Sequence, residues 1–144
     1  MKQSASVDER DGVIAVTSYS QTEAGFWATN GVILRLPGDV ANEIVGAAVS
    51  VALDASRQDV PTPAPDADIG RPLLRLFGVR SWGPYMVGTR SVGVRRWDGN
   101  VEVVPTRNRA KDGFVEMPDA VVTVEAPGDA ELGAAVREGL ARAV

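Results

Sequence analysis

The side chains that could do chemistry in this 144-residue chain are carboxylates, hydroxyls, Arg and Lys, because the sequence contains neither His nor Cys. Without His, a Ser–His–Asp or Cys–His arrangement is impossible, and a zinc site would need carboxylates alone. His is also the side chain that most often transfers protons near neutral pH. No GxxxxGK[ST] or GxGxxG motif follows a predicted strand. We therefore expect no enzyme activity, no metal and no cofactor.

Two carboxylates on one predicted hairpin are candidate catalytic residues. Asp98 and Glu102 could serve a hydrolase that works with paired carboxylates. Strand alternation places Glu102 on the same face as Val104, however, where a solvated surface residue is the simpler interpretation. We do not predict catalysis from this pair.

The charges are unevenly distributed along the chain. Residues 71–111 contain nine Arg or Lys residues and two acidic ones, although the whole chain has a net charge of −4. The basic stretch, with its aromatic residue, could bind nucleic acid, and the alternative is a solvated face that keeps the protein soluble. This stretch includes Arg90, Arg95, Arg96, Trp97, Arg107 and Arg109. The carboxylates elsewhere could instead meet a basic partner, so both classes of ligand stay open.

The elements that would position these residues are clearest at the C-terminus, VVTVEAPGDAELGAAVREGLARAV. Its β-forming start and the Pro-Gly-Asp that follows predict a strand and then a helix over about 129–143, capped by Asp129. Steps of three and four predict one buried face: Leu132, Ala135, Val136, Gly139, Leu140 and Ala143. A similar pattern over 32–56 predicts a helix over about 39–56, capped by Asp39. Its predicted buried face is Val45, Ala48, Val49, Ala52 and Leu53, widened by Ile44 and Val51. Whether the two halves are a true duplication stays open.

The remaining segments predict one α+β domain over residues 1–144. Residues 1–12 are expected to form a flexible tail and 57–70 a proline-rich linker loop. We expect strands near 13–20, 26–29 and 32–36, with Asn30-Gly31 as a hairpin turn, and a second hairpin, 90–97 with 101–106, around Asp98. A short helix is expected over 71–78, while 81–88 is either a turn or a bent helical segment. The fold class is thus an antiparallel sheet of about five or six strands, two main helices and one or two short ones.

The N-terminus lacks the apolar core of a signal peptide, and no apolar run approaches about 18 residues. The expected location is therefore the cytoplasm, without a membrane partner.

From about Ser18 onward, the chain resembles the immunity proteins of bacterial contact-dependent growth inhibition (CDI) systems. The resemblance runs through SYSQTEAGFWATNG, GAAVSVALDASR, PLLRLFGVRSW, DGNVEVVPTRNR and PGDAELGAAVREGLARA. The proline-rich linker and Gly83-Pro84 depart from the expected pattern. The resemblance implies a cytoplasmic protein that binds the toxin domain delivered by a neighbouring cell and blocks its active site, with a ribonuclease A-like toxin as the implied partner.

Carboxylates in loops could occupy the cationic cleft in which a nuclease holds phosphate. On this hypothesis we nominate six toxin-binding residues next to the predicted hairpins, with the aromatic one as an anchor. They are Glu23, Trp97, Asp98, Asp112, Glu116 and Asp119. The alternative for each carboxylate is a solvated loop charge. A small nucleic-acid- or anion-binding module that uses residues 71–111 is the second function that we carry forward.

Overall fold

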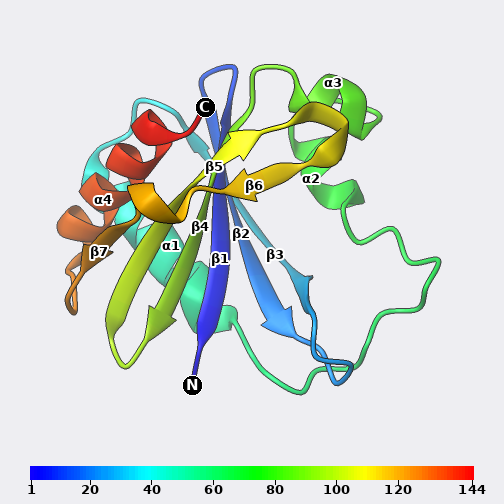
Figure 1. Cartoon of the computed structure of the whole chain (residues 1–144), viewed down its shortest axis with the longest axis horizontal. Coiled ribbons are helices and arrows are strands. Elements are labelled where there is room, and N and C mark those ends of the chain that lie inside the picture. Colours follow the sequence, from blue (N-terminus) through cyan, green and yellow to red (C-terminus); the bar gives the residue numbers. More distant parts are fainter.

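Alternating apolar and polar residues build a seven-stranded antiparallel sheet, and the structure, a computed structural model, describes all residues from 1 to 144 (Figure 1). The strand order is β3-β2-β1-β4-β5-β6, while β7 pairs with the first half of β5. The strands are β1 Gln3–Arg10, β2 Val13–Gln21, β3 Trp27–Pro37, β4 Arg90–Trp97, β5 Asn100–Asn108, β6 Phe114–Glu116 and β7 Val122–Val124.

Helices cover the two faces of this sheet unequally. The long helices α1 (Asn42–Ala55) and α4 (Asp129–Arg142) lie together on one face, over the main core. The short helices α2 (Arg71–Leu76) and α3 (Trp82–Met86) pack on one end of the opposite face, around Ala15 (Figure 1). Two 3-10 turns, η1 (Ala110–Asp112) and η2 (Pro118–Ala120), flank β6. The α+β prediction, with two main helices, is confirmed.

The predicted buried faces of both long helices are confirmed, since every residue predicted on them is buried except for the two that were expected to widen the first face. Ile44 and Val51 are 48% and 52% exposed. They lie on the solvent side of α1, because Val45 and Val49 take the side that faces the main core. The flank of α1 that carries Gly46 packs on α4.

Two glycines set the contact between the long helices. A Cβ on Gly46 would lie 1.8 Å from the carbonyl oxygen of Asp129, and one on Gly133 would lie 1.8 Å from that of Asn42. Each glycine is the fifth residue of its helix and meets the first residue of the other helix. The two glycines therefore allow the two helices to pack directly against each other.

The predicted helix caps are wrong at both sites. The N-cap residues are Ala41 and Gly128, and neither makes a side-chain capping hydrogen bond. Asp39 lies in the loop before α1, while Asp129 is the first residue of α4. From that position the Asp129 carboxylate still interacts favourably with the positive end of the helix dipole.

The prediction that residues 1–12 form a flexible tail is wrong, because residues 3–10 form β1 near the middle of the sheet. Val7 pairs with Val16 of β2 on one side and with Val92 of β4 on the other. Ala5 and Val7 point into the main core, and the intervening serines point to the opposite face. The segment QSASVDER contributes only two residues to the main core, and its composition is therefore too polar to indicate a strand.

Asn30-Gly31 is not a hairpin turn but lies inside β3. Three residues of β3 face one residue of β2 there, and Gly31 adopts a φ of 90° that suits such an irregularity. The Asn30 side-chain amide donates hydrogen bonds to Ser18 Oγ (2.8 Å) and Ser20 Oγ (3.0 Å), which holds the bulge against β2. The β2–β3 connection instead lies at residues 22–26.

The second predicted hairpin is confirmed as β4–β5. Trp97 pairs with Asn100 around a two-residue turn whose Asp98 and Gly99 both have positive φ, 50° and 82°. Residues 81–88 contain the helix α3, and 57–70 run as an irregular connection with one bridge between Thr22 and Val60. None of the helices has the length and apolar character needed to span a membrane.

Candidate interaction surface

The six nominated residues are all exposed, but the structure does not gather them into one patch. Trp97 ends β4 and Asp98 lies in the turn before β5, whereas Asp112 follows the other end of β5, so the length of β5 separates them by roughly 30 Å. Glu23 lies in the β2–β3 connection, Glu116 ends β6, and Asp119 lies in η2. Trp97 is 57% exposed and is the most exposed of the three tryptophans.

A hollow on the open face of the sheet brings together residues that sequence reasoning did not select. The centre of this hollow is formed by small residues of β1 and β4, Ser4, Ser6 and Gly93. In the register of these strands, Ser4 pairs with Arg95 and Ser6 with Gly93. The larger side chains of Tyr19 and Trp27 border it. This sheet hollow has a volume of about 550 Å³ and is lined by Lys2, Ser4, Ser6, Tyr19, Trp27, Gly93, Arg95 and Glu116. A neighbouring depression shares Lys2 and Arg95 and reaches Trp97.

The charges above the sheet hollow form an exposed ion pair between Arg95 and Glu116. Such pairs between partly exposed side chains contribute little to stability, about 0–1 kcal/mol. Both side chains can therefore re-pair with an incoming molecule at small cost. Of the nominated residues, Glu116 and Trp97 line this face, and the other four occupy loops next to the strands.

A buried carboxylate lies where α3 covers the sheet. Asp8 accepts hydrogen bonds from the Tyr85 hydroxyl and from Ser91 Oγ, the latter at 2.6 Å. Burial raises the pKa of Asp8 above its ordinary value, although both hydrogen bonds act in the opposite direction. Burial, and then the negative charge of Asp8, raise the pKa of Tyr85 as well. The arrangement fixes α3 to β1 and β4 and keeps the Tyr85 hydroxyl protonated.

The sequence offered one signal for these residues. Ser4, Ser6 and Asp8 alternate with Ala5 and Val7, which is the pattern of a strand with one apolar face.

Tyr19 also has its pKa raised, chiefly by burial, and its hydroxyl lies 3.4 Å from Ser6 Oγ. No group of three or more carboxylates lies close enough together to hold a metal ion.

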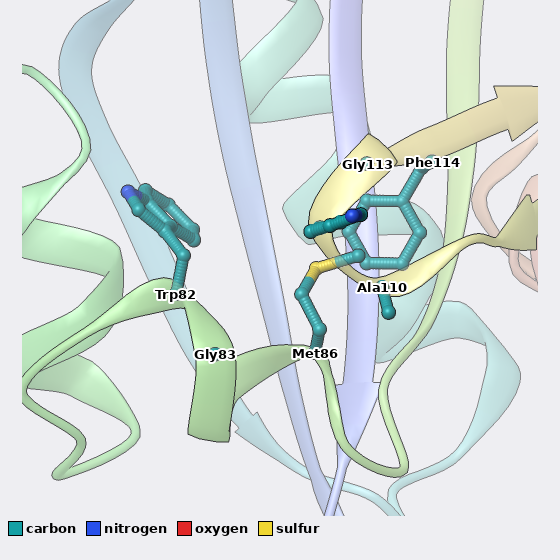
Figure 2. Close-up of a pocket in the computed structure, with 7 residues that line it drawn as sticks. Trp82, Gly83, Met86, Ala110, Gly113 and Phe114 are labelled. Carbon is teal, nitrogen blue, oxygen red and sulfur yellow. The ribbon is translucent and has the colours of Figure 1, made fainter.

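A second opening lies between α3 and the β5–β6 connection. Figure 2 shows Trp82 on one side of it and Met86 and Phe114 on the other. This α3 cleft has a volume of about 550 Å³, and Gly83, Ala110, Lys111 and Gly113 complete its lining. It continues toward the sheet hollow through a smaller depression that shares Trp82 and Phe114 with the cleft and Tyr19 and Glu116 with the hollow. The open face is thus a polar hollow at one end and an apolar cleft at the other.

Comparisons with known proteins add the following. A model of the CDI immunity protein family matches residues 3–143. The fold is similar to that of a protein of unknown function from Neisseria meningitidis, with a TM-score of 0.84, 20% identity, and coverage of 100% of this chain and 96% of that chain. It is also similar to a chain of a CdiA-CT/CdiI toxin and immunity complex from Yersinia pseudotuberculosis, with a TM-score of 0.81, 19% identity, and coverage of 100% and 98%. No curated protein sequence matches the chain.

Proposed function

The chain belongs to the CDI immunity protein family, and from this premise we propose that it binds the toxin domain delivered by a neighbouring cell and blocks that toxin's active site in the cytoplasm. The observation that carries the proposal is the family match over residues 3–143, nearly the whole chain. A stoichiometric inhibitor needs a complementary surface and no reaction of its own. The open face of the sheet offers such a surface.

We assign the toxin contact to the sheet hollow. Its small central residues leave room for a protruding loop or side chain, and the exposed Trp97 at its end is of the residue type that most often anchors protein interfaces. Glu116 would lie inside the contact. Glu23, Asp98, Asp112 and Asp119 would belong to its polar rim, where charges influence association rate and specificity more than affinity.

The proposed toxin is a nuclease, of the ribonuclease A-like type that the sequence resemblance implies. A nuclease holds phosphate in a cationic cleft, and this chain has a net charge of −4. Carboxylates such as Glu116, which lines the hollow, and Asp98, in the turn next to Trp97, would be attracted to that cleft and occupy it. Inhibition would then follow from covering the active site.

The experiment tests protection and contact together. A cell that expresses the toxin domain encoded next to this gene should stop growing, and co-expression of the wild-type protein should restore growth. Gly93→Phe would fill the centre of the hollow, because a Cβ at Gly93 meets no heavy atom within 4 Å and its φ is not positive. We expect Gly93→Phe to lose protection while its melting temperature stays near that of the wild type.

The matched control is Ala134→Phe, on the exposed side of α4 and thus across the sheet from the hollow. It should protect as the wild type does. Growth arrest that the wild-type protein fails to relieve would contradict the proposed function. Full protection by Gly93→Phe would contradict only the assignment of the contact to the hollow.

A further inference from the structure

The α3 cleft has apolar walls that are open to solvent. Trp82 is 46% exposed although its ring stacks edge-to-face with Tyr85, at a centroid distance of 5.4 Å and an interplanar angle of 88°. Met86 and Phe114 face it across the opening (Figure 2). A volume of about 550 Å³ is within the range of sites that enclose a small ligand or an inserted side chain. An apolar group that entered would remove part of Trp82 from water.

The cleft is formed before anything binds. The β5–β6 side of the cleft is held against α3, because the side-chain amide of Asn108, the last residue of β5, donates hydrogen bonds to the carbonyl oxygens of Met86 (2.5 Å) and Thr89 (2.9 Å). The loop above it is closed by the Arg109 N–H donating to the Gly113 carbonyl at 2.9 Å. A preformed site loses little conformational entropy on binding, which favours affinity.

The one charged residue among those that line the cleft is basic. This residue is Lys111, and Arg109 directly precedes the same 3-10 turn η1, in which Asp112 is the single carboxylate. Within residues 71–111, ion pairs involve only Arg71, Arg95 and Arg96. The basic residues without an ion pair are Arg75, Arg80, Arg90, Arg107, Arg109 and Lys111, and all of them are exposed. A ligand for this end of the molecule would be apolar at its tip and negatively charged beside it.

We propose that the α3 cleft receives an apolar side chain, flanked by Asp or Glu, from an acidic segment of the toxin; this rests on the proposed function. A nuclease holds phosphate in a cationic site, so the acidic segment that enters the α3 cleft would be one outside that site. The cleft is therefore an anchor that distinguishes the cognate toxin from others, whereas the sheet hollow covers the active site. Lys111 pairs with the flanking carboxylate.

The test measures the affinity of the full-length protein for the toxin domain by titration calorimetry. Lys111→Glu should weaken binding at least tenfold, and the loss should shrink at high salt because the contact is exposed. Arg35→Glu makes the same charge change on exposed β3 outside the cleft and should change affinity less than twofold. Trp82→Ala removes one wall and should also weaken binding at least tenfold. Its control, Val51→Ala, removes an exposed apolar side chain from α1 and should have no effect.

The outcomes separate this inference from the proposed function. If the wild-type protein does not bind the toxin domain, the proposed function fails and the cleft assignment fails with it. If the wild type binds and both Lys111→Glu and Trp82→Ala bind equally well, only the cleft assignment is overturned. Single-stranded RNA that binds the wild-type protein and is released by Lys111→Glu, while toxin affinity is unchanged, would instead make the cleft a nucleic-acid site.

Discussion

Replacing Gly46 by Ala should separate the two long helices. The added Cβ would lie 1.8 Å from the Asp129 carbonyl oxygen, about 1.6 Å closer than the 3.4 Å at which an ordinary contact begins. A backbone oxygen cannot rotate away, so α4 itself must move. Overpacking of this kind costs about 1–3 kcal/mol, while Ala in place of Gly inside a helix returns roughly 0.5–1 kcal/mol. Because the clash is with backbone atoms, the cost lies at the upper end of that range, and we expect a net loss of about 2 kcal/mol.

For a chain of this length, that loss corresponds to a fall in melting temperature of about 4–8 °C. Calorimetry or circular dichroism measures it, and Gly93→Ala provides the matched control, because a Cβ there meets nothing within 4 Å. Gly93→Ala should melt at or slightly above the wild-type temperature. A Gly46→Ala variant that melts no lower than Gly93→Ala would refute the close helix contact.

Three further changes test the surface and the buried carboxylate. Trp97→Ala should weaken toxin binding by about 2 kcal/mol, or roughly thirtyfold, without lowering the melting temperature, and unchanged affinity would remove Trp97 from the interface. Reversing Asp112, Glu116 and Asp119 together to Lys should weaken toxin binding at least tenfold while the protein stays folded; wild-type affinity would exclude these carboxylates. Because burial raises the pKa of Asp8 above 3.8, the native state retains a proton that the unfolded chain has released. The resulting stability is fully present below pH 3.8 and is lost as the pH rises through the raised pKa. The free energy of unfolding, measured by urea titration at several pH values across this range, should fall less with rising pH for Asp8→Asn than for the wild type. An equal fall in the two proteins would contradict the assignment of a raised pKa to Asp8.

Local signals predicted those elements whose sequence carries its own pattern. The helix over 129–142 repeats apolar residues at steps of three and four, and the hairpin around Asp98 has a turn that tolerates positive φ. Long-range pairing decided the rest. β1 is a strand because β2 and β4 pair with it on both sides, and the alternation over residues 4–8 is too short and too polar to predict this on its own.

The same limit applies to the site. Trp97 could be found from the sequence, because it lies beside a turn at the end of a strand. The sheet hollow could not, since Ser6 and Gly93 come from strands more than eighty residues apart and are notable only for being small and adjacent. Likewise, Asp39 and Asp129 resembled helix caps by residue type, but the N-cap residues are Ala41 and Gly128, which residue type does not indicate.

The most direct test of the account is titration of the wild-type protein with a catalytically inactivated form of the toxin domain encoded beside its gene. The account predicts a one-to-one complex with a dissociation constant of about nanomolar magnitude, as is usual for specific protein pairs. Absence of binding heat, together with separate elution of the two proteins in gel filtration, would contradict it.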